Sequence, residues 1–356
     1  MGSRALFVGA ALTAAVLLLL TGCAPARYDG PVSDHFDGRE FHNETPFPHK
    51  FSDLLGYVFS REKIEWPRDE SVPQRPAPVE RIGTGGLRLT WVNHATLLIQ
   101  ADNLNLLTDP IWSERASPLS FAGPKRHHPP GIPFSKLPPI DVVMISHSHY
   151  DHMDSPTLKR LHAEHNPLFV VPLGNAVLLE SLGIERIVEL DWWQGVSLSN
   201  GCSLSAAQVK HWSNRRVFPS DRNLSLWAGF VLETTGGPVY FGGDSGYGPH
   251  YGKTRERYGA MRAAMLPIGA YLPRWFMAYQ HMGPAEAVQA HQDLAAQFSL
   301  GIHWGAFKLS VERRFQAVED LAVEVKRSGL NERDFVAPAV GAHYDVQPLP
   351  GATGCR

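Results

Sequence analysis

The segment HSHYDH, residues 147–152, places three histidines and one aspartate in six consecutive positions. Side chains two positions apart in an extended chain point to the same side, so His147 and His149 can share one metal ion. If the chain turns immediately afterwards, Asp151 and His152 can reach a second ion nearby. Imidazole and carboxylate ligands suit Zn²⁺, with Fe or Mn as alternatives. The segment therefore predicts a metal site.

Three further residues of the same ligand types, His211, Asp244 and His303, follow predicted strands later in the chain. Each has an ordinary explanation when taken alone. A single histidine after a strand is usually a hydrogen-bonded core residue, and an aspartate after two glycines is usually a turn residue. A dense segment combined with three later single ligands is what a binuclear site requires. The residues alone do not divide the seven groups between two ions.

The segment YLPRWFMAYQHM, residues 271–282, is the best candidate for the mouth of a substrate site. Trp275, Phe276 and Tyr279 place much apolar area in a proline-bounded loop. Gln280 and His281 are polar groups expected near the metals, and His281 is a candidate contact to a substrate phosphate rather than a ligand. The alternative is an ordinary buried connection between a strand and a helix.

Strands and helices alternate along the part of the chain that must position these side chains. The run IDVVMIS, residues 140–146, is continuously apolar, as expected for a strand buried on both faces. Asn200-Gly201 and Gly236-Gly237 indicate hairpin turns. Helices are expected at residues 155–165, 174–183, 249–258, 284–298 and 311–328. This order predicts an α/β sandwich with sheets inside and helices outside. GGDSGYG does not have the spacing of a dinucleotide-binding fingerprint.

The amino-terminal residues 1–22 have the pattern of a signal peptide, with one early charge followed by an apolar run. Their end, Leu20 to Cys23, resembles a bacterial lipobox, in which the cysteine is lipidated; a single-pass anchor is the alternative. Ala24 in the next position favours the outer membrane by the same resemblance. Residues 23–80 are expected to form an extended tether with one short helix at 51–59, and residues 81–356 the domain that carries the predicted metal site.

The overall composition fits a protein with a sizeable core and no nucleic-acid partner. Apolar residues make up 44% of the chain, and 33 Lys and Arg against 35 Asp and Glu give a formal net charge of −2. A nucleic-acid footprint would need clustered positive charge. Three cysteines exclude a structural zinc site of four cysteines, and whether Cys202 and Cys355 pair stays open. His94, His127 and His128 lack the spacing or partners of ligands and are expected to be structural.

The strings SHSHYDHMD, ELDWWQG, FGGDSGY, LPIGAYLPRWFMAYQHMGPAEAV and IHWGAF resemble the metallo-β-lactamase superfamily. Within it they are similar to the N-acylphosphatidylethanolamine-hydrolysing phospholipase D family and its bacterial relatives, from about Leu87 to Val336. Asn93 departs from the family, which commonly carries Gly there. The resemblance implies a four-layer αβ/βα sandwich. It also implies one zinc ion on His147, His149 and His211, another on Asp151, His152 and His303, and Asp244 bridging both.

The resemblance further implies a phosphodiesterase that cleaves phospholipid head groups with water activated by two zinc ions. Asp151, Asp244 and His281 would take part in catalysis, and no serine or cysteine nucleophile is needed. The protein would sit in the bacterial cell envelope, anchored by lipid at Cys23 to the periplasmic face of the outer membrane. Two alternatives stay open: hydrolysis of a lactone or another ester on the same fold, and a non-catalytic envelope lipoprotein. β-Lactam hydrolysis is not expected.

Overall fold

The computed structural model describes residues 28–356 except 49, 51–52, 54–55, 58–63, 74, 217–219, 353 and 356. The predicted signal peptide and the predicted lipidation site at Cys23 lie outside the described residues, as does most of the short helix expected at 51–59. Within the described part, no helix is long and apolar enough to cross a membrane.

Two seven-stranded sheets form the centre of the molecule. The strands of the first sheet, in the order β14-β1-β2-β3-β4-β5-β6, are β1 (Leu87–Asn93), β2 (Thr96–Ala101), β3 (Leu104–Thr108), β4 (Val142–Met144), β5 (Leu168–Pro172), β6 (Ile187–Leu190) and β14 (His343–Asp345). The strands of the second, in the order β13-β12-β11-β10-β9-β8-β7, are β7 (Gly195–Ser197), β8 (Ser203–Ala207), β9 (Gly229–Leu232), β10 (Val239–Phe241), β11 (Ala263–Pro267), β12 (Ser299–Ile302) and β13 (Phe335–Val336).

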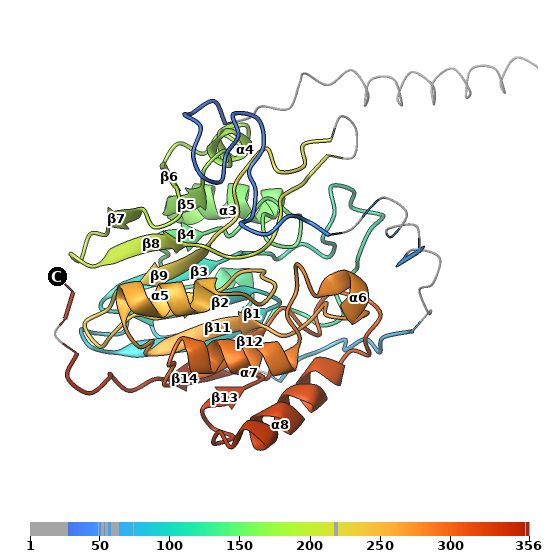
Figure 1. Cartoon of the computed structure of the whole chain (residues 1–356). Helices are drawn as coiled ribbons and strands as arrows, with labels where there is room; N and C mark the ends of the chain where they lie inside the picture. Colours follow the sequence, from blue (N-terminus) through green and yellow to red (C-terminus); the bar gives the residue numbers. More distant parts are fainter. Residues whose placement is uncertain are drawn as a thin grey trace, which may run out of the picture.

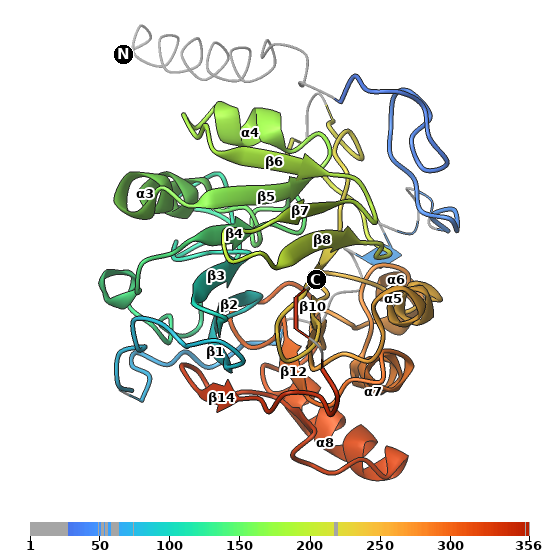
Figure 2. The same cartoon turned by 90° about the vertical axis from the view of Figure 1, so that its left-hand side faces the viewer.

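Helices cover the outer faces of both sheets (Figures 1 and 2). They are α3 (Ser155–His165), α4 (Ala176–Glu180), α5 (His250–Tyr258), α6 (Arg274–Met277), α7 (Pro284–Asp293) and α8 (Gln316–Ser328), with a 3-10 helix at Phe134–Lys136. Helices α3 and α4 lie over the first sheet, and α5, α7 and α8 lie over the second. The predicted four-layer αβ/βα sandwich is confirmed.

The strands that carry the predicted ligands all run in one direction within each sheet. Strands β3 to β6 are parallel to one another, and so are β10 to β13. Strand β1 shares the direction of β3, and β8 that of β10, because one antiparallel strand separates each pair. The carboxyl ends of these strands therefore lie along one edge of each sheet, where ligands of α/β proteins commonly bind.

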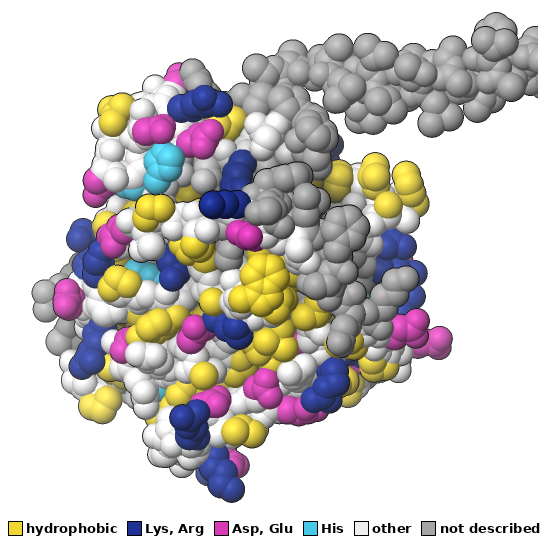
Figure 3. Space-filling view, turned by 45° about the vertical axis from the view of Figure 1, so that its right-hand side comes forward, with side chains coloured by type: hydrophobic (Ala, Val, Ile, Leu, Met, Phe, Trp, Pro, Cys, Tyr) yellow, Lys and Arg dark blue, Asp and Glu magenta, His cyan; other side chains and the backbone are white. Residues whose placement is uncertain are grey.

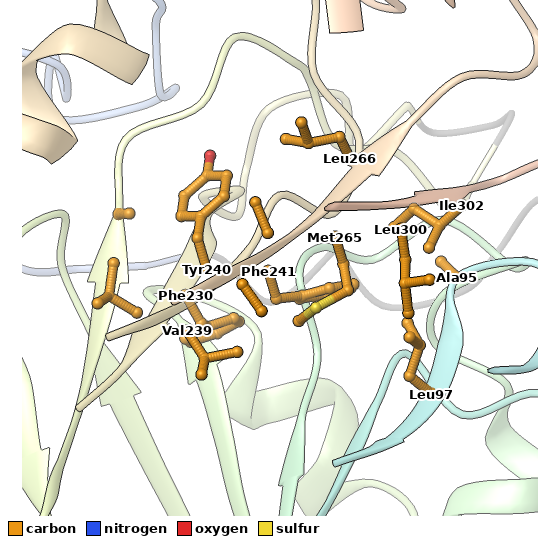
Figure 4. Packing of buried hydrophobic residues seen from close by; sticks show 14 of the residues in the cluster. Ala95, Leu97, Phe230, Val239, Tyr240, Phe241, Met265, Leu266, Leu300 and Ile302 are labelled. Atoms are coloured by element: carbon orange, nitrogen blue, oxygen red, sulfur yellow. The ribbon is translucent and has the colours of Figure 1, made fainter. Parts of the chain in front are cut away.

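The space between the sheets is filled by apolar side chains from both. Ala95 and Leu97 of the first sheet lie toward Leu300 and Ile302 of the second (Figure 4). Strand β4 is buried on both faces, as its apolar run predicts: Val142 and Met144 belong to the cluster between the sheets, and Val143 to the cluster under α3. Burial of each such side chain contributes about 2 kcal/mol, so the inner strands form a rigid base for the loops at their ends.

Three helices are shorter than their sequence pattern predicts. Helix α4 covers only Ala176–Glu180 of the expected residues 174–183. Helix α7 ends at Asp293 rather than near 298, since Ala295 adopts a left-handed backbone conformation with φ of 44°. Helix α8 begins at Gln316 rather than near 311. Glu312 is buried just before it, and its carboxylate accepts a hydrogen bond from the Ala270 amide at 2.5 Å. A tertiary contact therefore outweighs local helix propensity at that end.

The segment 28–46 is not the extended tether that its composition predicts. Phe36 and Phe41 are 2% and 0% exposed and belong to the main core cluster. The Phe41 amide donates to the Asn223 carbonyl at 2.8 Å. His35 Nε2 lies 2.7 Å from Asp191 Oδ1. Two aromatic side chains thus attach this segment to the body, while the predicted domain boundary near residue 80 stays a prediction.

The carboxyl terminus is attached by a disulfide between Cys202 and Cys355, which answers the pairing left open by the sequence. Cys202 lies in the turn between β7 and β8, so the bond joins the last residues to that hairpin. On the face shown in Figure 3, basic side chains are interspersed with acidic ones rather than gathered in one patch. That distribution agrees with the balanced composition.

Candidate metal centre

The predicted ligands gather where the strand ends of the two sheets meet. The HSHYDH segment follows β4, His211 follows β8, Asp244 follows β10 and His303 follows β12. Every one of these strands ends at the same edge of its sheet, which is why residues far apart in sequence come together. All seven predicted ligand side chains belong to clusters whose nitrogen and oxygen atoms lie within 4.8 Å of one another.

Three histidines form one half of the cluster. His149 Nδ1 lies 2.7 Å from His147 Nε2 and 3.3 Å from His211 Nε2. The three rings come from two different sheets; His147 and His211 are buried, and His149 is half-buried. Three nitrogens converging on one point form one face of a tetrahedral site.

Two carboxylates and two histidines form the other half. Asp151 Oδ2 lies 3.2 Å from His152 Nε2 and 3.3 Å from His303 Nε2. Asp244 Oδ2 lies 3.2 Å from His152 Nε2, 3.1 Å from His303 Nε2 and 3.8 Å from His211 Nε2. Asp244 therefore lies between the two halves and reaches both.

The donor set fits a pair of zinc ions. Ligand atoms at the usual 2.0–2.1 Å from a tetrahedral Zn²⁺ are about 3.3 Å from one another, which matches the contacts of Asp151, His152, His303 and Asp244. His152 Nε2 and Asp244 Oδ1 are buried and have no hydrogen-bond partner. Buried polar atoms are normally hydrogen-bonded or bound to a cation. A metal ion would satisfy both.

In three of the histidines, His147, His152 and His211, the nitrogen that points away from the centre is fixed by a hydrogen bond. His152 Nδ1 donates to Asp109 Oδ2 at 2.6 Å, and Ser146 Oγ donates to the same oxygen at 2.6 Å. His147 Nδ1 in turn donates to Ser146 Oγ at 2.9 Å. His211 Nδ1 donates to the Gln280 carbonyl at 3.0 Å. Each bond places the ring proton on the outer nitrogen and leaves the inner lone pair free for a metal.

Sequence reasoning missed Asp109 and misplaced His94. Asp109 follows β3 just as Asp244 follows β10, so its position at a strand end was an available signal. His94 was expected to be structural, but its Nε2 lies 2.9 Å from Asp151 Oδ2 and its ring centroid 4.0 Å from that of His303. The β1–β2 turn places it at the same edge. His127 and His128 contact the carbonyls of Pro67 and Pro129 instead.

Arg215 holds the HSHYDH segment from outside. Its Nη1 donates to the carbonyls of Ser148 and Met153, both at 2.8 Å, so one guanidinium joins the two ends of the turn. The same guanidinium lies 4.0 Å from the centroid of the Tyr150 ring. Arg215 thereby closes the turn that lets Asp151 and His152 reach the second half of the cluster. The spacing of residues in the sequence did not indicate this role.

The electrostatics of the centre separate neutral ligands from charged ones. Burial lowers the pKa of His147 well below its ordinary value, that of His149 to about 3 and that of His211 to about 4, so these rings are neutral. For His303, burial opposes protonation, but Asp244 and Asp151 raise its pKa to about 9. The two carboxylates thus attract positive charge to this half, and a divalent cation would supply it.

A cavity of about 500 Å³ opens over the centre. His149, Asp151, Asp244 and His281 line its base, and the walls include Ala116, Pro118, Tyr150, Trp212, Arg215, Phe276, Met277, Gln280 and Leu309. Of the predicted substrate residues, Phe276, Gln280 and His281 line this cavity. His281 Nδ1 is buried without a hydrogen-bond partner and lies 3.8 Å from Asp244 Oδ2.

Two of the predicted substrate residues lie outside the cavity lining. Trp275 is 54% exposed on the surface of α6. Tyr279 is 9% exposed, and its hydroxyl accepts from Asn43 Nδ2 at 3.0 Å and donates to the Thr45 carbonyl. The Tyr279 hydroxyl is therefore hydrogen-bonded to the amino-terminal segment. The structure places this residue outside the cavity lining, whereas the sequence predicted it beside the substrate.

Comparison with known proteins identifies the family. A beta-lactamase superfamily domain matches residues 104–304, which include all seven predicted ligands. The chain is 35% identical over 299 residues to N-acyl-phosphatidylethanolamine-hydrolyzing phospholipase D 1 of Caenorhabditis elegans, covering 79% of this chain and 83% of that protein. The chain belongs to the beta-lactamase superfamily, in the family of the N-acyl-phosphatidylethanolamine-hydrolyzing phospholipase D relatives.

Other members and structures agree with this placement. The mitochondrial N-acyl-phosphatidylethanolamine-hydrolyzing phospholipase D of Saccharomyces cerevisiae is 32% identical over 258 residues, covering 71% of this chain and 54% of the yeast protein. The fold matches Igni18, a metallo hydrolase from Ignicoccus hospitalis, with a TM-score of 0.55 at 19% identity, over 74% of this chain and 99% of that one. The protein is thus a metal-dependent hydrolase of the beta-lactamase superfamily. The division of the ligands between two ions that the family resemblance implies, and the role of each ligand, stay a prediction.

Proposed function

We propose that the protein is a binuclear zinc phosphodiesterase of the phospholipase D type that acts on phospholipids like N-acylphosphatidylethanolamine. The observation that carries the proposal is the convergence of seven ligand groups beside a cavity that three of them, His149, Asp151 and Asp244, line. The C. elegans and yeast relatives, each named for hydrolysis of this lipid, support the choice of substrate class.

The chain's own residues hold and orient the metals. His147, His149 and His211 would bind one zinc ion, Asp151, His152 and His303 the other, and Asp244 both. Zinc, when bound, supplies a Lewis acid and lowers the pKa of a water molecule toward about 7, so that hydroxide is available at neutral pH.

His281 is placed to act on the substrate. Burial lowers the pKa of His281 well below its ordinary value, so the ring is neutral and can donate one proton or accept one. Its position at the cavity base, 3.8 Å from Asp244, suits contact with a phosphate oxygen or with the departing oxygen. The Gln280 side chain lies beside it with Oε1 buried and unpaired. Together they offer polar contacts that a bare metal pair lacks.

The cavity walls suit an apolar substrate portion. Phe276, Met277, Pro118 and Leu309 contribute apolar surface around the polar base. A head group at the metals with acyl chains along these walls would match polar with polar and apolar with apolar.

Two alternative functions are compatible with the same fold. The metals would serve a lactone or another ester equally well, and a non-catalytic lipoprotein would need neither Gln280 nor His281. The purified zinc-loaded chain should hydrolyse bis(p-nitrophenyl) phosphate faster than a lactone and should release phosphatidic acid from N-acylphosphatidylethanolamine in mixed micelles. Faster lactone cleavage would favour the second activity, and no turnover of any of these substrates would favour the third.

We further propose that the protein is exported and anchored by lipid at Cys23, on the periplasmic face of the outer membrane. The Cys202–Cys355 disulfide supports export, because such bonds persist in oxidising compartments such as the bacterial periplasm. The lipobox-like sequence that ends at Cys23 supplies the anchor.

A further inference from the structure

The amino-terminal segment 28–46 reaches the metal centre from outside the superfamily domain that matches residues 104–304. Phe36 and Phe41 hold its first part in the core, and the chain then runs to Asn43. Glu44, the next residue, contacts Lys253 Nζ and accepts from Gln208 Nε2 at 3.1 Å. The Glu44 side chain is 54% exposed, so its contacts lie at the surface, and the buried rings of Phe36 and Phe41 are what fix the segment that carries Asn43.

Asn43 uses both ends of its carboxamide on elements of the site. Its Nδ2 donates to the backbone carbonyl of His211 at 2.7 Å and to the hydroxyl of Tyr279 at 3.0 Å. Its Oδ1 accepts from Trp227 Nε1 at 3.1 Å. One side chain thus connects the loop after β8, the approach to β9 and the turn after α6.

These contacts bear on the His211 ring through two routes. The first is direct, because the His211 carbonyl is held by Asn43. The second runs through Tyr279, whose neighbour Gln280 supplies the carbonyl that accepts from His211 Nδ1 at 3.0 Å. The Tyr279 backbone has little room to shift, since a Cβ at Gly246 would lie 2.0 Å from its carbonyl oxygen. Asn43 therefore holds both the ligand's backbone and the group that orients its ring.

We propose that Asn43 is a positioning residue of the metal centre, and that segment 28–46 is a working part of the site rather than a tether. Asn43 does not contact a metal or the cavity; it acts through His211 and through the turn at Tyr279 to His281. The inference rests on the proposed function only in taking His211 as a metal ligand. It adds that the superfamily domain alone is an incomplete site in this chain.

The test compares Asn43→Ala, Asn43→Asp and Glu44→Gln in the full chain. Asn43→Asp keeps the size and the acceptor for Trp227 but cannot donate to the His211 carbonyl. Glu44→Gln disturbs the same segment without touching His211 or Tyr279, so it is the matched control. Zinc affinity is measured by competition with a chromophoric chelator, and the geometry of the site by the visible spectrum of the Co²⁺-substituted protein.

Both Asn43 variants should lose about tenfold or more in affinity for one of the two zinc ions and show an altered Co²⁺ spectrum, while Glu44→Gln behaves like the unmodified chain. Wild-type affinity and spectrum in Asn43→Asp would overturn the proposal, and so would an equal change in Glu44→Gln. If Asn43→Ala does not fold, Asn43→Asp decides, because it preserves the packing. The readouts need no substrate: a chain whose zinc affinity depends on Asn43 but that cleaves no phosphodiester would refute the proposed function and leave this inference standing.

Discussion

At the scale of single residues, three imidazoles of the centre are held by three different kinds of partner. A hydroxyl holds His147, a carboxylate holds His152 and a backbone carbonyl holds His211. Of these partners, the Asp109 carboxylate is the most constrained, because it is fully buried and accepts hydrogen bonds from both His152 and Ser146. It places a negative charge next to the site, orients the His152 ring directly and orients the His147 ring through Ser146.

We therefore expect Asp109→Asn to weaken zinc binding by about 10–100-fold while the chain still folds. The amide keeps the shape, but Oδ1 of Asp109 accepts from the Ser146 amide while Oδ2 accepts from His152 Nδ1 and Ser146 Oγ, so the NH2 group of an asparagine would face a donor on one side or the other. Affinity measured with a competing chelator checks this, and Asp345→Asn, at an exposed acidic residue, is the control. Unchanged zinc affinity in Asp109→Asn would mean that the His152 ring is held by packing alone.

Asp244→Asn should abolish turnover and leave the fold intact. Asp244 Oδ2 lies 3.2 Å from His152, 3.1 Å from His303 and 3.8 Å from His211, so a neutral amide there cannot offset the charge of two cations. We expect a loss beyond about 100-fold in kcat/KM on bis(p-nitrophenyl) phosphate, larger than for groups that only orient ligands. Near-normal rates with two metals bound would show that Asp244 is not the bridge.

Residue types and spacing sufficed to predict the seven ligand positions but not their supports. A histidine pattern is visible in sequence because the ligands are rare residue types at strand ends. Asp109, Arg215 and Asn43 act by hydrogen bonds to backbone or to ligand rings, and such bonds depend on tertiary geometry that spacing does not encode. His94 was missed because the β1–β2 turn, not a local motif, places it beside Asp151.

At the scale of elements, helix α6 and the turn after it combine two roles that the sequence could not separate. Residues 271–282 supply Phe276, Gln280 and His281 to the cavity, but Tyr279 faces the amino-terminal segment and Trp275 faces outward. A helix of four residues presents successive side chains in different directions. The sequence showed that the segment is rich in aromatic residues, but the direction of each ring depends on where the helix begins and ends.

The two neighbouring rings of α6 should therefore respond differently to removal. Phe276 is 7% exposed and stacks on Tyr57 with centroids 4.6 Å apart, so Phe276→Ala should cost about 3 kcal/mol of unfolding free energy and impair soluble and lipid substrates alike. Trp275→Ala removes a side chain that is 54% exposed, so stability should change by less than about 0.5 kcal/mol.

The two substrates distinguish what Trp275 does. If its ring contacts the lipid surface, Trp275→Ala lowers hydrolysis of phospholipid in mixed micelles and leaves bis(p-nitrophenyl) phosphate untouched. Chemical denaturation measures stability, and parallel assays of both substrates measure function. Equal rates of Trp275→Ala and the unmodified chain on both substrates would exclude a role for this ring at the lipid surface.

At the scale of the whole molecule, the proposed metal pair would join the two sheets. The ligands after β4 belong to the first sheet, and those after β8, β10 and β12 to the second, so each proposed ion is held from both. Removing the metals should leave the buried carboxylates and rings without partners and lower the unfolding temperature. A ligand at about 100 times its dissociation constant stabilises by about 2.7 kcal/mol, so the shift should be several degrees.

Elemental analysis of protein from zinc-replete growth should find two zinc ions per chain. Treatment with a chelator should abolish activity and lower the unfolding temperature, and added zinc should restore both. The exposed ion-pair variant Asp345→Asn should show the same stoichiometry as the unmodified chain. Full activity at one zinc ion or fewer would contradict the binuclear proposal.

Attachment to the membrane is the last property that the chain's organisation predicts. Because segment 28–46 packs against the body, only the stretch from Cys23 to Tyr28 separates the proposed anchor from folded protein, and an extended chain of five residues spans at most about 18 Å. Cys23→Ser should release the protein into the soluble fraction, with unchanged activity on bis(p-nitrophenyl) phosphate and lower activity on lipid in vesicles. Cell fractionation and the two assays measure this. A Cys23→Ser protein that still pellets with membranes after a high-salt wash would place the attachment elsewhere, with the exposed Trp275 as the first residue to examine.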